Sequence, residues 1–94
     1  MDKILYHDKL CQTGSKLELQ NFIMSHKDPI DEINILHMCN NKNIDYEILR
    51  ELIIECNELF KRPLLFLIIQ NLSRIGKYGL IDYLVDYFKI EKGL

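Results

Sequence analysis

Apolar residues recur along the chain with the spacing of α-helices, in six segments that short polar turns separate. In residues 47–58, for example, leucine and isoleucine fall on one helical face and glutamates fall on the other. No segment sustains the alternation of period two that would indicate a β-strand. The pattern therefore predicts an all-α fold of six short helices.

Capping residues indicate where these helices begin. Ser15 and Asp45 are expected N-caps, and Asp31 or Asn34 is expected to cap the third helix. Pro63 is tolerated in a first helical turn, where its missing N–H costs nothing. We expect helices from residue 2 or 3 to 12, from 16 to 26, from just after the Asp31 or Asn34 cap to 40, and at 46–57, 62–75 and 80–89.

A weak internal repeat groups the six segments into pairs. The segments 18–24, 47–53 and 79–85 share apolar residues at their second, sixth and seventh places, and each belongs to a second helix. Among the first helices, Ile35 aligns with Pro63, a spacing of 28 residues. We therefore predict one helical domain, residues 1–94, made of helix-turn-helix pairs at 1–30, 31–60 and 61–94.

Two first helices contain parts of a known motif. Asn34–Cys39 has a Leu-His pair followed by a small residue, and Arg62–Leu67 has a Pro-Leu pair. In these residues the chain resembles the ankyrin-repeat family, whose first helix begins Thr-Pro-Leu-His-x-Ala. The resemblance implies an ankyrin-like solenoid of three stacked pairs, with Leu36 and Leu64 in the core. It also implies that His37 is a scaffold histidine that bonds to neighbouring backbone.

A second resemblance is to the death-effector domain, which also has six helices in about this length. Residues 15–23 look like its second helix, and residues 47–59 look like its fourth. Its Arg-x-Asp-Leu motif is missing, because no aspartate precedes Leu80. This resemblance implies a death-fold six-helix bundle, which stays open as the alternative.

Composition and charge exclude several classes of protein. The 94 residues are 48% apolar and 28% charged, values typical of a folded globular domain. With 12 basic and 14 acidic residues the net charge is −2, which disfavours nucleic acid and anionic membranes as partners. The longest apolar run, Leu64–Ile69, has six residues and predicts a central buried helix instead of a membrane span.

The chain also offers little catalytic chemistry. Two cysteines and two histidines could in principle hold zinc, but their spacing is unlike that of zinc modules and favours buried thiols: Cys11, Cys39, His7 and His37. No phosphate-binding loop or nucleophile motif occurs. We expect no enzyme and no cofactor. Three widely spaced cysteines and the lack of an export signal predict an intracellular, cytoplasmic protein.

These observations favour a non-enzymatic protein-interaction module, an adaptor or an inhibitor that binds the surface of another protein. Stacks of this kind bind through exposed positions of the first helices and through loops. The predicted partner-binding residues there are Met38, Asn41, Lys61, Arg62, Phe66 and Gln70. The alternative is homotypic assembly, with an acidic stripe on residues 47–58 meeting Lys61, Arg62 and Lys77. That stripe is otherwise a solvated outer face.

The C-terminal pair is more apolar than one neighbouring pair can bury. The residues concerned are Phe66, Ile69, Leu72, Ile75, Tyr78, Tyr83, Tyr87 and Ile90. Large exposed apolar patches usually mark an interface. We therefore predict that Tyr83 and Tyr87 lie at a surface that docks on a partner or forms a homodimer with a second copy about a two-fold axis.

Overall fold

Six α-helices make up most of the described chain. The computed structural model describes residues 3–25 and 29–90, with side chains from Asp8 onward. Within these ranges there is no strand, so the predicted all-α class with six short helices is confirmed. The helices are α1 (Lys3–Thr13), α2 (Lys16–Ser25), α3 (Glu32–Met38), α4 (Tyr46–Cys56), α5 (Arg62–Arg74) and α6 (Tyr78–Phe88), with a 3-10 turn, η1 (Asn57–Leu59).

Side-chain caps fix the start of three helices. Ser15 Oγ accepts the Glu18 N–H at 3.2 Å, and Glu18 Oε1 accepts the Ser15 N–H at 3.0 Å. Asp31 and Asn34 form the same reciprocal box at the start of α3. Asp45 caps α4 by accepting a backbone N–H three residues later at 3.1 Å. The predicted caps Ser15 and Asp45 are confirmed, and Asp31 is the one that caps the third helix.

Two helix boundaries differ from the predictions by two residues. α3 ends at Met38, two residues earlier than expected. α6 begins at Tyr78 instead of Leu80, so Gly79 lies inside the helix. A Cβ at Gly79 would come within 2.8 Å of the Tyr46 hydroxyl, which explains why glycine suits this position. Gly79 was expected to belong to a turn, so the sequence did not indicate that α6 approaches α4 closely here.

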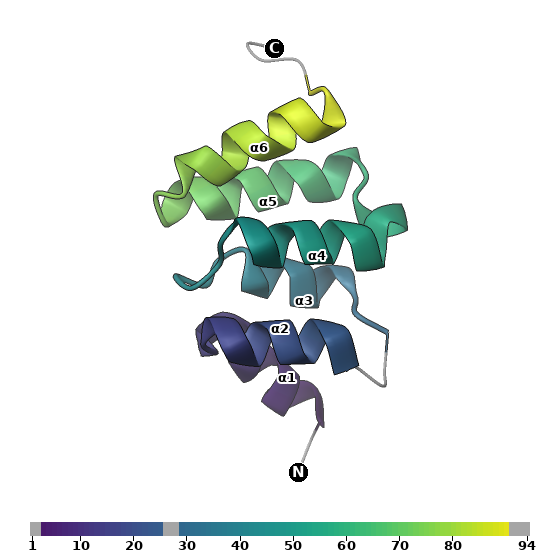
Figure 1. Ribbon diagram of the computed structural model, residues 1–94, viewed down its shortest axis with the longest axis vertical. Helices are drawn as coiled ribbons and strands as arrows, with labels where there is room; N and C mark the ends of the chain where they lie inside the picture. The colour runs from purple at the N-terminus through teal and green to yellow at the C-terminus, as the bar shows by residue number, and fades with distance from the viewer. Residues whose placement is uncertain (1–2, 26–28, 91–94) are drawn as a thin grey trace.

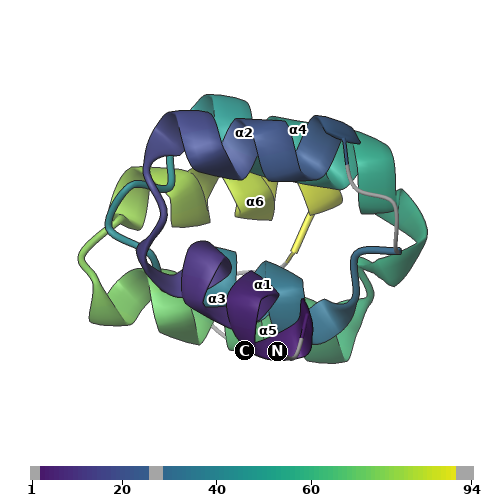
Figure 2. The ribbon, with the colours of Figure 1, turned by 90° about the horizontal axis from the view of Figure 1, so that it is seen from below.

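The helices lie in two layers, which Figures 1 and 2 show from the side and from one end. The first layer contains α1, α3 and α5 side by side, and the second layer contains α2, α4 and α6. α6 meets α4 through Tyr83, whose ring lies edge-on to Tyr46 with centroids 5.8 Å apart. Phe60 and Phe88 stack at 5.8 Å near the other end of α6. Adding one helix after another to each layer gives an elongated molecule of 45 × 25 × 20 Å.

One hydrophobic core fills the space between the layers. Burial of each leucine or isoleucine side chain contributes about 1.5–3 kcal/mol. The largest fully buried side chains are Leu19, Ile23, Ile35, Met38, Ile44, Ile48, Leu49, Leu52, Ile53, Leu64, Ile68 and Leu72. Among the described helices, none has both the length and the apolar character that crossing a bilayer requires.

The apolar run 64–69 is not a fully buried helix. Leu64, Leu65 and Ile68 are buried, but Phe66 is 52% exposed and Leu67 is 45% exposed. A helix turns by about 100° per residue, so a run of six apolar residues surrounds it on all sides. α5 has the core on one side only, and the prediction of a central buried segment is therefore wrong.

The first helices also repeat with a different spacing from the predicted 28 residues. The N-caps Asp31 and Lys61 stand 30 residues apart. In this register Met38 occupies the place of Ile68, and both side chains are fully buried. Leu36 takes the place of Phe66 and is only half-buried instead of lying wholly in the core. The division of the chain into pairs at 1–30, 31–60 and 61–94 stays a prediction.

Candidate functional site

The first layer presents a row of exposed side chains along α5. Arg62, Phe66, Gln70 and Arg74 are each four residues apart, and all four are exposed. Residues with this spacing lie on one side of a helix. Because the buried residues of α5 face the second layer, this row faces away from it. Three of the four, Arg62, Phe66 and Gln70, are predicted partner-binding residues.

α3 extends this surface with further apolar side chains. Ile33 is 58% exposed, and Leu36 is half-buried at the position equivalent to Phe66. Leu67 lies four residues before Asn71, whose amide donates to the Leu36 carbonyl at 3.0 Å, so Leu67 is on the side of α5 toward α3. We call Ile33, Leu36, Phe66 and Leu67 the first-layer patch.

Two predicted contact residues are buried. Met38 is fully buried, and Asn41 is 1% exposed, so neither presents its side chain to a partner. Asn41 Nδ2 donates to the carbonyls of Cys11 and Gly14, each at 3.0 Å, and its Oδ1 accepts the Asn43 N–H at 2.8 Å. The prediction that Met38 and Asn41 are exposed is wrong. The 28-residue register caused the error at Met38, and an unrecognised cap caused it at Asn41.

Asparagine amides link successive helices of the first layer. Asn71 stands 30 residues after Asn41 and reaches back in the same way, to the Leu36 carbonyl near the end of α3. The last carbonyls of a helix have no intrahelical N–H partner, and a side-chain donor can satisfy them. These two amides therefore hold each first helix to the one before it.

The other predicted residues divide between two parts of the molecule. Lys61, Arg62, Phe66 and Gln70 are exposed on α5 or at its N-cap. Tyr87, on α6 in the second layer, is 49% exposed. Tyr83 is half-buried between Tyr46 and Tyr87, with ring centroids at 5.8 and 6.0 Å. The structure does not bring the tyrosines onto the first-layer patch.

Sequence reasoning missed Ile33 and Leu67, although a signal was available. Gln70 and Arg74 follow Phe66 on the same row of α5, and a polar row marks a side of a helix that water reaches. The unbroken apolar run masked this polarity. Ile33 was overlooked because the motif compared with the ankyrin repeat begins after it, at Asn34.

His37 connects α3 to α1 through side chains. Gln12 Nε2 donates to His37 Nδ1 at 3.1 Å, and Asp8 Oδ1 lies 3.8 Å from His37 Nε2. Among the described atoms its partners are therefore side chains, whereas the ankyrin resemblance implied backbone groups. His37 thus joins α3 to α1 through Gln12 and Asp8.

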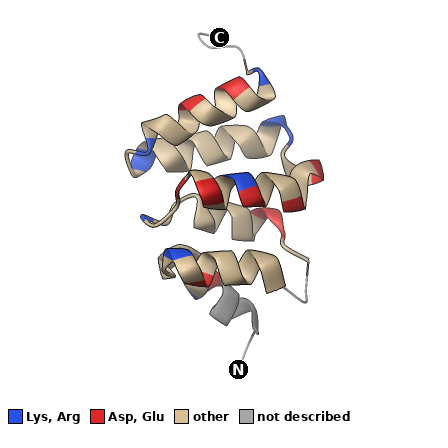
Figure 3. Ribbon diagram, in the orientation of Figure 1, with Lys and Arg blue, Asp and Glu red and all other residues tan. Residues whose placement is uncertain are grey.

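Charge is distributed unevenly between the layers (Figure 3). α5 contains no acidic residue, and basic residues stand at both of its ends. On the second layer, Lys16 bridges Asp45 Oδ2 at 2.8 Å and Glu47 Oε1 at 3.2 Å. Hydrogen bonds to Asp45 and Glu47 raise the pKa of Lys16. Burial raises the pKa of Asp45, but bonds from Lys16 and the backbone outweigh it and bring that pKa below its usual value.

A solvated outer face was predicted for the acidic stripe on α4, but only part of the stripe is solvated. Glu47 and Glu55 are exposed, but Glu51 is half-buried, and its Oε2 is buried without a hydrogen-bond partner among the described residues. A buried unpaired carboxylate oxygen is costly. The stripe therefore combines solvated and partly covered positions.

The three thiols belong to the core. Burial raises the pKa of Cys11 and of Cys39 to about 12, and it raises the pKa of Cys56 as well. Such thiols stay protonated at neutral pH, whereas metal ligands and nucleophiles are thiolates. In the described part of the chain, no three His, Cys, Asp or Glu side chains gather closely enough to hold a metal ion.

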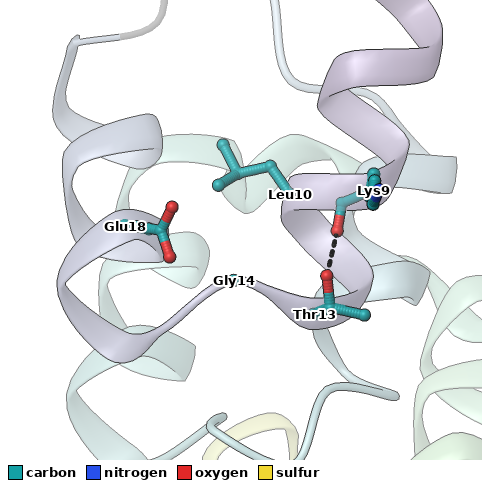
Figure 4. A pocket seen from close by; sticks show the side chains of 5 residues that line it. All are labelled: Lys9, Leu10, Thr13, Gly14 and Glu18. Carbon is teal, nitrogen blue, oxygen red and sulfur yellow. Dashed lines mark hydrogen bonds between the residues drawn. The ribbon is translucent and has the colours of Figure 1, made fainter.

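A small hollow of about 220 Å³ opens between α1 and α2 (Figure 4). Its lining residues are Lys9, Leu10, Thr13, Gly14 and Glu18. The Thr13 hydroxyl donates to the Lys9 carbonyl at 2.9 Å, and Glu18 is engaged in the helix cap. A Cβ on Gly14 would lie 2.5 Å from the Leu10 carbonyl oxygen, so the turn requires glycine. The Thr13 hydroxyl and the Glu18 carboxylate are thus used by the turn itself.

A second hollow, of about 270 Å³, lies where the loop before α4 meets the turn before α6. Its lining includes Tyr46, Lys77 and Tyr78. Ligand pockets usually enclose about 300–1,000 Å³. Both hollows are smaller than this range, and the exposed first-layer patch remains the stronger candidate for binding.

Comparison of the chain with models of protein families, with curated proteins and with solved structures finds no match. The resemblances to the ankyrin-repeat family and to the death-effector domain therefore stay predictions. The geometry of the first layer is the basis on which a function can be proposed.

Proposed function

We propose that this chain is a protein-interaction module, an adaptor or inhibitor, that binds a partner protein through its first layer. The observation that carries the proposal is the first-layer patch. Phe66, Leu67 and Ile33 expose apolar side chains on neighbouring helices, on the side where no further layer covers them. Contiguous exposed apolar side chains with polar residues around them are typical of protein interfaces.

The order of the helices supports an ankyrin-like stack of three pairs. First helices contact first helices, from α1 to α3 to α5, and α2 contacts α4 in the second layer. A repeated helix pair that contacts only its neighbours is the architecture of helical repeat proteins, which bind through extended surfaces. In the 30-residue register the Leu-His pair of α3 and the Pro-Leu pair of α5 stand at different positions of their helices, so the stacking order carries this assignment.

Binding without catalysis, in an intracellular, cytoplasmic setting, completes the proposal. Cys11 and Cys39 are free, buried thiols, as expected for a protein of a reducing compartment. The His37 ring is engaged with Gln12. Neither a cofactor nor a nucleic acid is needed for an apolar surface of this kind to act.

Capture from an extract of cells that produce the chain tests this function. The bait carrying Phe66→Glu with Leu67→Glu should lose a partner that the wild type retains at a defined stoichiometry. The matched control is Ile54→Glu, because Ile54 is 67% exposed on α4 in the second layer. Circular dichroism establishes that each bait is folded. Identical retained proteins for all three baits would reject the first-layer surface.

Homotypic assembly of the death-effector kind is a second candidate, favoured by the separation of charge. Acidic Glu47 and Glu55 lie on α4, whereas Lys61 and Arg62 lie before and on α5. Opposite surfaces of this kind can join copies head to tail. Sedimentation at low and high salt separates the candidates, because assembly through charge gives oligomers that dissociate as salt rises.

A further inference from the structure

We infer that the partner presents an apolar segment with acidic side chains, and that this segment lies along α5. The inference rests on the proposed function and adds the chemistry of the partner. It follows from the order of residues on the exposed row, in which two arginines enclose an aromatic and an amide side chain: Arg62, Phe66, Gln70 and Arg74.

The arginines of this row are free to bind. Lys61, Arg62 and Arg74 are exposed, and within the described ranges none of them forms an ion pair with an acidic side chain. By contrast, Lys16 on the second layer is already held by two carboxylates. A guanidinium group binds a carboxylate through two parallel hydrogen bonds, which is among the stronger polar contacts at an interface.

The spacing of the row sets the length of the segment. Twelve residues of helix at 1.5 Å each separate Arg62 from Arg74 by about 18 Å. An extended chain covers that distance with about six residues, at roughly 3.3 Å each. Apolar residues in the middle of such a segment would lie on Phe66 and Leu67, with a carboxylate near one or both arginines.

The same surface fits other partners less well. Glu32 is exposed at the start of α3, so one carboxylate stands at the Arg62 end of the surface and would repel a phosphate backbone. Phe66 is the single ring of the first-layer patch, and Ile33 and Leu67 are aliphatic, so successive bases would find no row of rings on which to stack. Arg74 lies at the other end of α5, away from the Glu32 carboxylate. We therefore expect Arg74 to make the stronger contact with an acidic side chain of the partner.

Selection from a library of random 16-residue peptides displayed on phage tests the inference. The wild-type chain is the bait, and Phe66→Glu is used for counter-selection. Enriched peptides should combine apolar residues with aspartate or glutamate. For a synthetic copy of such a peptide, Arg74→Glu should raise Kd about tenfold, and raising the salt concentration should raise it further. Arg50→Glu on α4, an exposed arginine of the second layer, should leave Kd unchanged.

The outcomes distinguish a failure of this inference from a failure of the proposed function. Peptides that need Phe66 but contain no acidic residues, or whose Kd is the same for Arg74→Glu, would overturn the inference and leave the proposed function standing. A selection in which no peptide depends on Phe66 would contradict both. Tighter binding of single-stranded DNA than of any peptide would also overturn the inference. If Phe66→Glu proves unfolded, Leu67→Asp serves as the counter-selection bait.

Discussion

The side-chain amide of Asn41 lies 3.0 Å from the carbonyl of Gly14, so a residue after α3 caps the end of α1. The same nitrogen lies 3.0 Å from the Cys11 carbonyl, inside α1. Asn43 Nδ2 adds a further bond to Gly14 at 2.9 Å. Two successive first helices are therefore joined by hydrogen bonds as well as by packing.

Removal of this amide should destabilise the fold strongly. Asn41→Ala leaves the Cys11 carbonyl and the Asn43 N–H without these partners, and it removes one of the two side-chain bonds to the Gly14 carbonyl. We expect the free energy of unfolding to fall by about 2–3 kcal/mol. Urea denaturation followed by circular dichroism measures the change. The neighbouring Asn40→Ala is the matched control, because Asn40 is exposed and its loss should change stability by less than about 0.5 kcal/mol. Equal effects of the two substitutions would contradict the capping role.

The equivalent amide between α3 and α5 should matter less. Asn71→Ala removes a single bond to the Leu36 carbonyl, from a side chain that is only half-buried. We expect a loss of about 1 kcal/mol in the free energy of unfolding. Asn71→Asp should be no more stable than Asn71→Ala, because a carboxylate cannot donate a hydrogen bond to the Leu36 carbonyl. A variant Asn71→Asp as stable as the wild type would contradict a stabilising role for this hydrogen bond.

Helix content and helix starts could be predicted from the sequence because they depend on local interactions. Ser15 and Asp45 cap their helices through N–H groups three residues away. The site was harder to predict because exposure depends on what packs against a helix. Phe66 and Ile68 are both apolar, and only the position of the second layer makes the first exposed and the second buried. Asn41 could not be recognised as a cap, since its partners precede it by about 30 residues.

The buried thiols predict how stability changes at alkaline pH. The pKa of Cys39 is raised from 9.0 to about 12 in the folded chain, so above pH 9 only the unfolded chain ionises. Stability is therefore complete below pH 9 and falls as the pH rises toward 12. The slope is up to about 1.4 kcal/mol per pH unit for each such thiol. Urea denaturation between pH 8 and 10 measures it.

A variant with Cys11→Ala and Cys39→Ala provides the control for this slope. Its stability should be lower at neutral pH, because two core side chains become smaller. It should nevertheless decline less between pH 8 and 10 than that of the wild type. If both proteins decline equally, the thiols do not cause the pH dependence.

Pairing of two copies through the C-terminal helices is a prediction that sedimentation can test. Tyr87 and Tyr78 are 49% and 62% exposed on α6, whereas Leu72 of the predicted surface is fully buried. If this surface pairs two copies instead of docking on a partner, the wild type is a dimer at low micromolar concentration and Tyr87→Lys makes it monomeric. Met24→Lys should not change the sedimentation, because Met24 is exposed on α2, and α2 lies at the opposite end of the stack from α6. A wild-type monomer at every concentration would reject the dimer.

Tyr83 requires a different expectation. Its ring packs edge-on against Tyr46, where α6 meets α4. Tyr83→Lys should therefore lower thermal stability even in a monomer, by removing an aromatic pair worth about 0.5–1.5 kcal/mol beyond its buried area. Thermal denaturation of Tyr83→Lys and Tyr87→Lys compares the two. Equal melting temperatures would mean that Tyr83 does not support the contact between α4 and α6.

Site-specific photo-crosslinking tests most directly whether the first layer is the binding surface. A photoreactive benzoylphenylalanine replaces Phe66 in one variant and Ile54 in another, and both are irradiated in the cells that produce the chain. Both positions are more than half exposed, but they lie on opposite layers. We predict one dominant crosslinked protein from position 66 and none in common with it from position 54. The same product from both positions, or a product from position 54 alone, would contradict the account.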